Sequence, residues 1–210
     1  MGLNGNAIHN EDTPRGTFLG ERGVLYVMPY LNPWNWMNAA AVRETDEIVR
    51  AALARVGVPE GSVPVISTGG SMGGLCALVW PVYSALHPSA VVANCPVCDL
   101  VYHYGERSDL PRTLYAAFAD AEGDTVGEAL AARSPLHLAQ AGRMPRIDIT
   151  IFHCEEDKAV NKQKHSDRLV EALRPMPVAY YAVPGRGHCD LTDEMAALYN
   201  QTICRCAGVK

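Results

Sequence analysis

A glycine-rich turn between an apolar strand and an apolar helix constrains this chain more than any other feature. Residues 62–74 read Ser-Val-Pro-Val-Ile-Ser-Thr-Gly-Gly-Ser-Met-Gly-Gly, in which residues 69–73 fit the pattern G-x-S-x-G. Such a turn forces its serine into a strained backbone conformation, which favours residues without a Cβ two positions before and after it. Gly69 and Gly73 meet that need. The spacing predicts that Ser71 stands exposed at the top of a sheet, as a nucleophile would.

Two other interpretations of the turn compete with a nucleophile. One is a plain strand-to-helix turn with an incidental serine, and the other is a loop that cradles a phosphate. A P-loop ends in Gly-Lys-Ser or Gly-Lys-Thr, and no such ending follows here. The choice between the remaining interpretations therefore depends on whether catalytic partners are found elsewhere in the chain.

Apolar segments of strand length alternate with segments of helical periodicity along the chain. This alternation indicates the α/β class, with a doubly wound, mostly parallel sheet covered by helices on both faces. A length of 210 residues predicts a single domain, 1–210. Residues 99–145 contain no strong strand, and we expect them to form a small helical, cap-like insertion over the crevice. The predicted strands are residues 23–28, 63–66, 90–95, 147–152 and 178–183.

Composition and charge argue against several classes of function. The formal net charge of -5 has no long run of one sign behind it, which argues against nucleic acid as a partner. There is neither a run of about 18 apolar residues nor a signal-peptide pattern, so we expect no membrane association and a cytoplasmic location. The seven cysteines are then expected to be reduced thiols. The pairs Cys95/Cys98 and Cys204/Cys206 lack further ligands at zinc-finger spacing, so neither a metal nor a cofactor is predicted.

Partners for the serine are expected where other parallel strands end. A serine hydroxyl needs an imidazole to take its proton, and the imidazole needs a carboxylate to hold its tautomer. Asp157 follows the predicted strand 147–152, and His188 follows the predicted strand 178–183. Both lie on loops at the same sheet edge as Ser71, in the order Ser, Asp, His. The sequence therefore predicts a triad of these three residues.

Other residues remain candidates for the acid and for the base. Glu155 and Glu156 flank Asp157 on the same loop, and Asp99 follows the predicted strand 90–95, where it is a second geometrically allowed carboxylate. Among the seven histidines, His188 alone follows a Gly-x-Gly turn after the last predicted strand.

Aromatic residues after the first predicted strand point to a substrate pocket. Residues 29–38 contain Tyr30, Trp34 and Trp36 together with two prolines, and the insertion adds His103. In an open α/β sheet the ligand crevice lies beyond the carboxyl ends of the strands, which is where this loop is expected. We expect these four residues to line the pocket. The alternative is that the tryptophans only plug the edge of the core.

Four segments together resemble the α/β-hydrolase superfamily, in particular its prolyl oligopeptidase and dienelactone hydrolase-like branch. They are Gly-Gly-Ser-Met-Gly-Gly at 69–74, Arg-Ser-Pro-Leu-His at 133–137, His-Cys-Glu-Glu-Asp-Lys-Ala-Val at 153–160 and Pro-Gly-Arg-Gly-His at 184–188. The likeness covers about residues 23–205. It implies that Ser71 is the nucleophile, Asp157 the acid and His188 the base, with the Met72 N–H as one oxyanion donor.

The sequence departs from the resembling branch in two places. Cys154 replaces the usual glycine of the acid loop, and a His-Gly-Gly oxyanion motif is absent. By position, the resemblance places the oxyanion loop near Asn6 and makes residues 23–28 the fourth strand of the fold. It therefore implies a fold that lacks its first strands.

These observations predict a serine hydrolase that cleaves a carboxylic ester or a small amide through an acyl-enzyme. The expected partner is a small-molecule ester or a short peptide. A prolyl oligopeptidase-like serine peptidase is the alternative enzyme. A shortened, non-catalytic α/β-hydrolase scaffold is the alternative from a different class, and the oligomeric state is left open.

Overall fold

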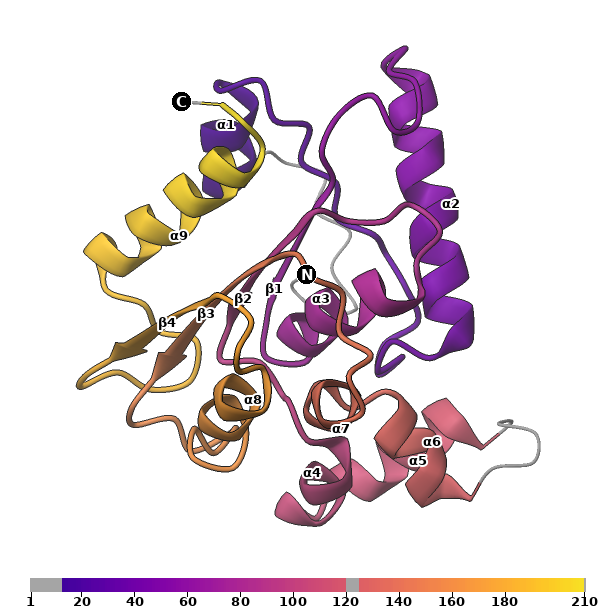
Figure 1. Cartoon of the computed structure of the whole chain (residues 1–210), viewed down its shortest axis with the longest axis vertical. Helices are drawn as coiled ribbons and strands as arrows, with labels where there is room; N and C mark the ends of the chain where they lie inside the picture. The colour runs from indigo at the N-terminus through magenta and orange to yellow at the C-terminus, as the bar shows by residue number, and fades with distance from the viewer. Residues whose placement is uncertain (1–12, 120–124, 210) are drawn as a thin grey trace.

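A four-stranded parallel sheet forms the centre of the chain. The computed structural model describes residues 13–119 and 125–209. The strand order is β1-β2-β3-β4, and each neighbouring pair is parallel. Because all four carboxyl ends lie at one edge, the loops that follow them meet there. The strands are β1 (Ile66–Gly70), β2 (Ala90–Asn94), β3 (Asp148–Cys154) and β4 (Val178–Val183) (Figure 1).

Helices cover both faces of the sheet, as the alternation of strands and helices predicts. Val91 and Ile151 face a core shared with α3, whereas Val92 and Phe152 face a second core shared with α9. Helices α1 and α9 lie together away from α3 (Figure 1). The helices are α1 (Pro14–Gly20), α2 (Ala39–Arg55), α3 (Met72–Tyr83), α4 (Leu100–Glu106), α5 (Leu110–Phe118), α6 (Val126–Ala132), α7 (Pro135–Gln140), α8 (Ser166–Ala172) and α9 (Asp193–Cys206).

The predicted strand at residues 23–28 is wrong. Residues 24–32 have no regular secondary structure and no ladder pairing, and β1 is an edge strand of the sheet. An apolar groove of about 340 Å³, lined by residues 23–29 and by residues 63–68, separates the two segments. A strand requires a hydrogen-bonded neighbour, and apolar composition alone does not supply one. The other four predicted strands are present, with bounds shifted by a few residues.

A buried carboxylate joins α2 to α3. Asp46 accepts hydrogen bonds from Trp80 Nε1 at 2.7 Å, from Ser84 Oγ at 2.6 Å and from the Ala85 N–H at 2.9 Å. Its side chain therefore has partners on both oxygens, as a buried charge requires. This contact holds α2 against the end of the helix that begins at Ser71.

The insertion is helical, as expected. It contains helices α4 to α7 (Figure 1). Hydrogen bonds of Glu106 connect it to the rest of the chain. Glu106 Oε2 lies 2.6 Å from His103 Nδ1 and 3.0 Å from His165 Nε2, while its Oε1 accepts the Asn161 N–H at 3.2 Å. One carboxylate thus connects α4 to the segment that runs from Asp157 to α8.

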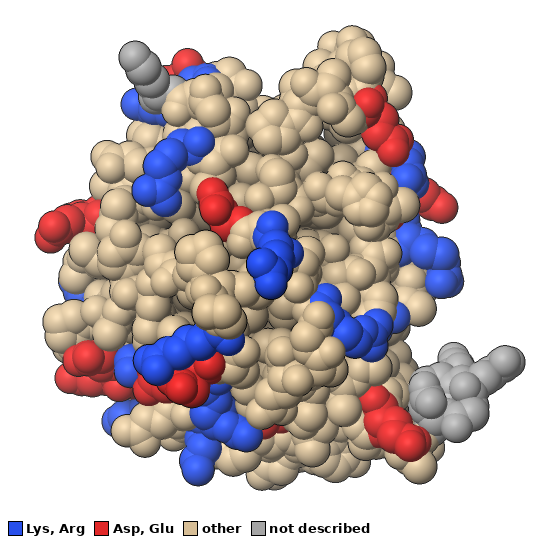
Figure 2. Space-filling view, in the orientation of Figure 1, with Lys and Arg blue, Asp and Glu red and all other residues tan. Residues whose placement is uncertain are grey.

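Charged side chains of both signs are interspersed on the face shown in Figure 2. Within residues 13–119 and 125–209, no helix has the length and apolarity needed to cross a bilayer.

Candidate active site

Ser71 occupies the sharp turn between β1 and α3. Its backbone adopts φ 55° and ψ -125°, a region that L-residues rarely enter. Backbone hydrogen bonds to β2 and the segment after it hold this conformation, among them one from the Ser71 N–H to Asn94 O at 2.9 Å and one from the Val97 N–H to Ser71 O at 3.3 Å. The predicted strand, turn and helix are all present, and the strained residue is the serine.

Close packing explains two of the glycines at the turn, Gly70 and Gly74. A Cβ on Gly74 would lie 2.9 Å from Pro96 Cα, and a Cβ on Gly70 would lie 3.2 Å from Cys189 Sγ. Both distances are shorter than ordinary van der Waals contact. Only glycine lets α3 begin this close to the segment that follows β2.

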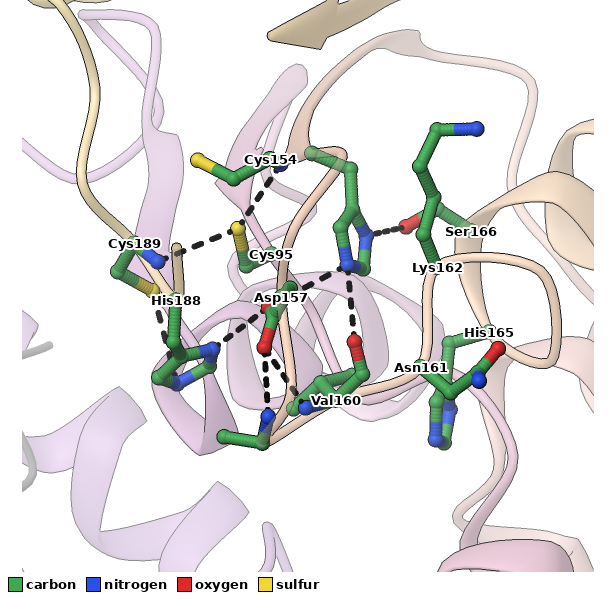
Figure 3. Close-up of polar contacts among 12 residues, drawn as sticks. Cys95, Cys154, Asp157, Val160, Asn161, Lys162, His165, Ser166, His188 and Cys189 are labelled. Carbon is green, nitrogen blue, oxygen red and sulfur yellow. Dashed lines mark hydrogen bonds and ion pairs between the residues drawn. The ribbon is translucent and has the colours of Figure 1, made fainter. Parts of the chain in front are cut away.

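The structure brings Ser71, His188 and Asp157 together. His188 Nε2 lies 2.8 Å from Ser71 Oγ, and His188 Nδ1 lies 2.7 Å from Asp157 Oδ2. A carboxylate accepts but does not donate, so Nδ1 carries the proton and the lone pair on Nε2 faces the serine hydroxyl. The three side chains come from loops after β1, β3 and β4, as predicted. Figure 3 shows His188 and Asp157 facing each other.

The acid is held in its ionised form. Burial alone raises the pKa of Asp157, but hydrogen bonds from His153, His188 and the Val160 N–H outweigh it and hold the pKa far below its ordinary value. The hydrogen bond to Asp157 raises the pKa of His188, and partial burial of the ring opposes that effect. The pair therefore favours a charged carboxylate beside an imidazole that readily takes a proton.

The His153 ring contacts the Asp157 carboxylate. The ring is fully buried, and its Nε2 lies 3.1 Å from Val160 O and 3.4 Å from Asp157 Oδ2. Because a carbonyl oxygen only accepts, Nε2 carries the proton, and Nδ1 accepts from Ser166 Oγ at 2.6 Å. The sequence analysis did not assign this positioning contact, although His153 stands four residues before Asp157.

The other candidate carboxylate is engaged elsewhere. Asp99 caps α4 by accepting the Tyr102 N–H at 3.0 Å, and its Oδ2 accepts from Arg168 Nη1 at 2.9 Å. Glu155 and Glu156 are exposed, and only their backbone N–H groups have hydrogen-bond partners among those found in residues 13–119 and 125–209. Among these carboxylates, Asp157 is the one beside His188.

Of the two predicted oxyanion donors, Met72 and Asn6, only Met72 is among the described residues. The Met72 N–H is at the first position of α3, where a helix leaves its N–H groups without intrahelical acceptors. Positive charge of the helix dipole gathers at this end. Asn6 lies outside the described residues.

The predicted pocket residues separate into two groups. Tyr30 is 55% exposed and Trp34 is 47% exposed, and Trp34 lines a groove of about 650 Å³ against α5. Trp36 and His103 are 1% and 2% exposed, and their rings meet edge to face. For Trp36 and His103 the expectation of an open pocket wall is therefore corrected, because Trp36 packs against His103 of the insertion and His103 packs against Trp36 and His165. For Trp36, the alternative of a core plug applies.

Three thiols lie beside the candidate triad, and the sequence analysis did not assign them to the site. Cys95 directly follows β2, Cys154 ends β3, and Cys189 directly follows His188. Cys189 Sγ lies 3.8 Å from His188 Nε2. Their positions at strand ends could have indicated this grouping. The sequence pair Cys95/Cys98 is not used as a unit, because Cys98 Sγ instead contacts Pro96 O and Ser166 Oγ.

Comparison with solved structures decides the fold. A puromycin hydrolase superposes with a TM-score of 0.63 at 23% identity, covering 83% of this chain and 26% of that chain. A puromycin-hydrolyzing peptidase of Mycobacterium tuberculosis gives 0.63 at 20% identity, covering 84% and 26%. An S-formylglutathione hydrolase from Agrobacterium tumefaciens gives 0.58 at 14% identity, covering 80% and 57%. The chain has an α/β-hydrolase fold.

The chain matches only part of each of these α/β-hydrolase structures, and the match is in the fold and not in the sequence. The chain spans about a quarter of the length of the puromycin-hydrolysing proteins that it matches. No protein-family model matches the sequence, and no curated protein matches it either. At these identities the likeness concerns the fold. The chemistry must be argued from the residues at the carboxyl ends of the strands.

Proposed function

We propose that the chain is a serine hydrolase that cleaves a carboxylic ester, or a small amide, through an acyl-enzyme on Ser71. One observation carries this proposal: a continuous hydrogen-bond chain runs from Ser71 Oγ through both nitrogens of His188 to Asp157 Oδ2, at 2.8 and 2.7 Å. Such a chain lets an imidazole remove the hydroxyl proton while a carboxylate stabilises the resulting imidazolium. Two solved structures of the same fold, the puromycin hydrolase and the S-formylglutathione hydrolase, are hydrolases by name and agree with this class.

Each residue then has a role in a balanced sequence of steps. Ser71 Oγ bonds to the substrate carbonyl carbon as His188 Nε2 takes its proton, and the carbonyl oxygen becomes an oxyanion near the Met72 N–H. The imidazolium returns this proton to the leaving alcohol or amine as the carbon–heteroatom bond breaks. Water, deprotonated by His188, next attacks the acyl-enzyme. The bond between Ser71 Oγ and the acyl carbon then breaks as the imidazolium returns this proton to Ser71 Oγ, which releases the acid. Asp157 holds the Nδ1 proton throughout.

A serine peptidase is the second candidate. The observation that favours it is the fold likeness to a puromycin-hydrolyzing peptidase and to a dipeptidyl peptidase 4 of Porphyromonas gingivalis. The sequence-based expectation that Tyr30 and Trp34 line the substrate pocket favours a neutral acyl or aryl group over a charged peptide terminus, and both rings are exposed. We therefore place the ester first.

Two measurements test the proposal. A fluorophosphonate probe should label the wild-type protein, and Ser71→Ala should abolish the labelling while leaving the melting temperature within a few degrees. Ser67→Ala, at a buried serine of β1, is the matched control and should still be labelled. Short p-nitrophenyl esters should be hydrolysed faster than aminoacyl p-nitroanilides. Equal labelling of Ser71→Ala would remove the nucleophile assignment, and faster turnover of anilides would favour the peptidase. Absence of labelling and turnover would favour a non-catalytic scaffold.

A further inference from the structure

Two cysteines and the candidate base form a compact group of metal-ligating atoms. One atom each from Cys95, His188 and Cys189 lies within 4.8 Å of the other two. Cys95 is buried, while His188 and Cys189 are partly exposed, so the group opens toward solvent on one side. Figure 3 shows the two cysteines beside the His188 ring. All seven cysteines are free thiols.

Two backbone N–H groups converge on the sulfur of Cys95, although the hydrogen bond from the Cys189 thiol and burial raise the pKa of the Cys95 thiol. Its Sγ accepts the Cys154 N–H at 3.3 Å and the Cys189 N–H at 3.4 Å. Two converging N–H donors stabilise negative charge on sulfur, in the way that outer-shell groups stabilise metal-bound ligands. Asn94 Nδ2 donates to the Cys189 carbonyl at 3.2 Å and fixes the second cysteine.

The base is also oriented as a metal-bound histidine would be. Metal-binding histidines commonly donate their other ring N–H to a carboxylate, which fixes the tautomer and makes the ligating nitrogen more basic. His188 Nδ1 has that arrangement with Asp157 at 2.7 Å, so Nε2 is the ligand atom. Nε2 lies 3.8 Å from Cys189 Sγ.

We propose that Cys95, Cys189 and His188 form a zinc site in which two thiolates and one imidazole nitrogen bind the ion. Zinc bonds of about 2.3 Å to sulfur and 2.0–2.1 Å to nitrogen place tetrahedral ligands about 3.5–3.8 Å apart. The present separations need to contract by no more than roughly 1 Å to reach that range. Thiolate and imidazole ligands select zinc over hard cations such as magnesium. Binding releases the two thiol protons, and the fourth position stays open to water.

Zinc in this site would silence the hydrolase. The lone pair on His188 Nε2 that faces Ser71 Oγ is the one that would bind the metal, so the imidazole could no longer accept the hydroxyl proton. This inhibitory effect rests on the proposed function, whereas zinc binding itself does not. The site thus couples hydrolysis to the local concentration of free zinc.

The other two groups of ligand-type residues found in residues 13–119 and 125–209 have competing partners. In the group Cys95, His153 and Asp157, the His153 nitrogens are bonded to Ser166 and Val160, and all three residues are buried. In the group His103, Glu106 and His165, His165 Nδ1 accepts the Cys98 and Asp99 N–H groups. Neither combines two thiols with an outward-facing imidazole.

The test is a titration of the reduced, metal-free protein with Zn²⁺ by calorimetry, and with Cd²⁺ by ultraviolet thiolate-to-metal absorption. We expect one ion per chain and a cadmium band from two thiolates. Cys95→Ser and Cys189→Ser should each weaken binding at least about 100-fold, by loss of one of three ligands. Cys206→Ser, which alters a half-exposed thiol on α9, is the matched control and should bind zinc normally. Ser71→Ala should also bind zinc normally.

The outcomes distinguish the zinc site from the proposed function. Wild-type affinity in both Cys95→Ser and Cys189→Ser, or a cadmium band unchanged in both, would overturn the site. If Cys95→Ser fails to fold, the partly exposed Cys189 alone decides the result. Zinc should inhibit p-nitrophenyl ester hydrolysis, a chelator should reverse this, and each variant is compared with its own metal-free rate. Zinc binding without any esterase activity would retain the site and reject the hydrolase.

Discussion

Asp157 Oδ2 lies 2.7 Å from His188 Nδ1 across 31 positions of the chain, and its other oxygen, Oδ1, accepts the N–H groups of Ala159 and Val160 at 2.8 and 2.9 Å. One carboxylate therefore shapes its own loop and orients the candidate base. Replacing it with an amide of the same shape separates these two tasks, because the amide oxygen can still accept from the loop.

Asp157→Asn should fold normally and lose turnover. The amide N–H₂ would face His188 Nδ1, which favours the tautomer with the proton on Nε2 and removes the acceptor that Ser71 needs. We expect kcat to fall on the order of 10⁴-fold with little change in melting temperature. Steady-state kinetics on a p-nitrophenyl ester check this.

Asp99→Asn is the matched control. Asparagine caps a helix as well as aspartate does, and the ion pair with half-exposed Arg168 contributes at most about 1 kcal/mol. We expect turnover within about twofold of the wild type, as for a change away from the reacting groups. A larger loss in Asp99→Asn than in Asp157→Asn would mean that the acid is misassigned.

The acidic limb of the pH profile should report His188. The hydrogen bond to Asp157 raises the pKa of this imidazole above its ordinary value of 6.5, and burial only partly offsets the rise. The base must be neutral to accept a proton, and a raised pKa keeps it protonated to higher pH. We therefore expect kcat/KM to reach half its maximum at a pH above 6.5 and to fall below it.

In Asp157→Asn the same limb should move toward lower pH, because the interaction that raises the pKa is gone. Residual kcat/KM measured across pH checks the direction. A wild-type midpoint below 6.5, or an upward shift in the variant, would contradict this account of His188.

Gly74→Ala should destabilise the fold near the nucleophile. The added methyl carbon would lie 2.9 Å from both Cα and Cβ of Pro96, so α3 and the segment after β2 would have to separate. We expect the free energy of unfolding to fall by about 1–3 kcal/mol, measured by urea denaturation.

Gly105→Ala in α4 is its control, because a Cβ there meets no atom within 4 Å. It should be neutral or stabilise by up to about 1 kcal/mol, since alanine is the better helix former. Equal effects at Gly74 and Gly105 would show that close packing at the turn is unimportant.

Asp46→Ala should cost more stability than most single changes. It leaves Trp80 Nε1, Ser84 Oγ and the Ala85 N–H without their shared acceptor in a buried position. We expect a loss of about 2–4 kcal/mol in urea denaturation. Glu47→Ala, at the exposed neighbouring position, should stay within about 0.5 kcal/mol, and a similar loss there would show that the effect at Asp46 does not come from its buried hydrogen bonds.

Local chemistry made much of this fold predictable. The turn at Ser71 is visible in sequence because only glycine-like neighbours tolerate its geometry, and the strand ends before Asp157 and His188 are visible from apolar periodicity. Features that depend on distant partners were not predictable. Residues 23–28 have the composition of a strand but find no ladder neighbour. Trp34 and Trp36 differ in exposure because Trp36 packs against His103 and donates to Thr113, whereas Trp34 faces an open groove. Whether Tyr30 and Trp34 contact substrate stays a prediction.

The separation of Ser71 from His188, 117 positions apart and four parallel strands across, has a consequence for folding. Each parallel pairing closes a long loop, so the sheet forms slowly compared with its helices. The hydrogen-bond chain exists only after β1 and β4 are both in register. During refolding from urea, the circular dichroism of the helices should therefore return before ester hydrolysis does. The rate at which turnover returns would then report the rate at which the last strand pairs with the sheet.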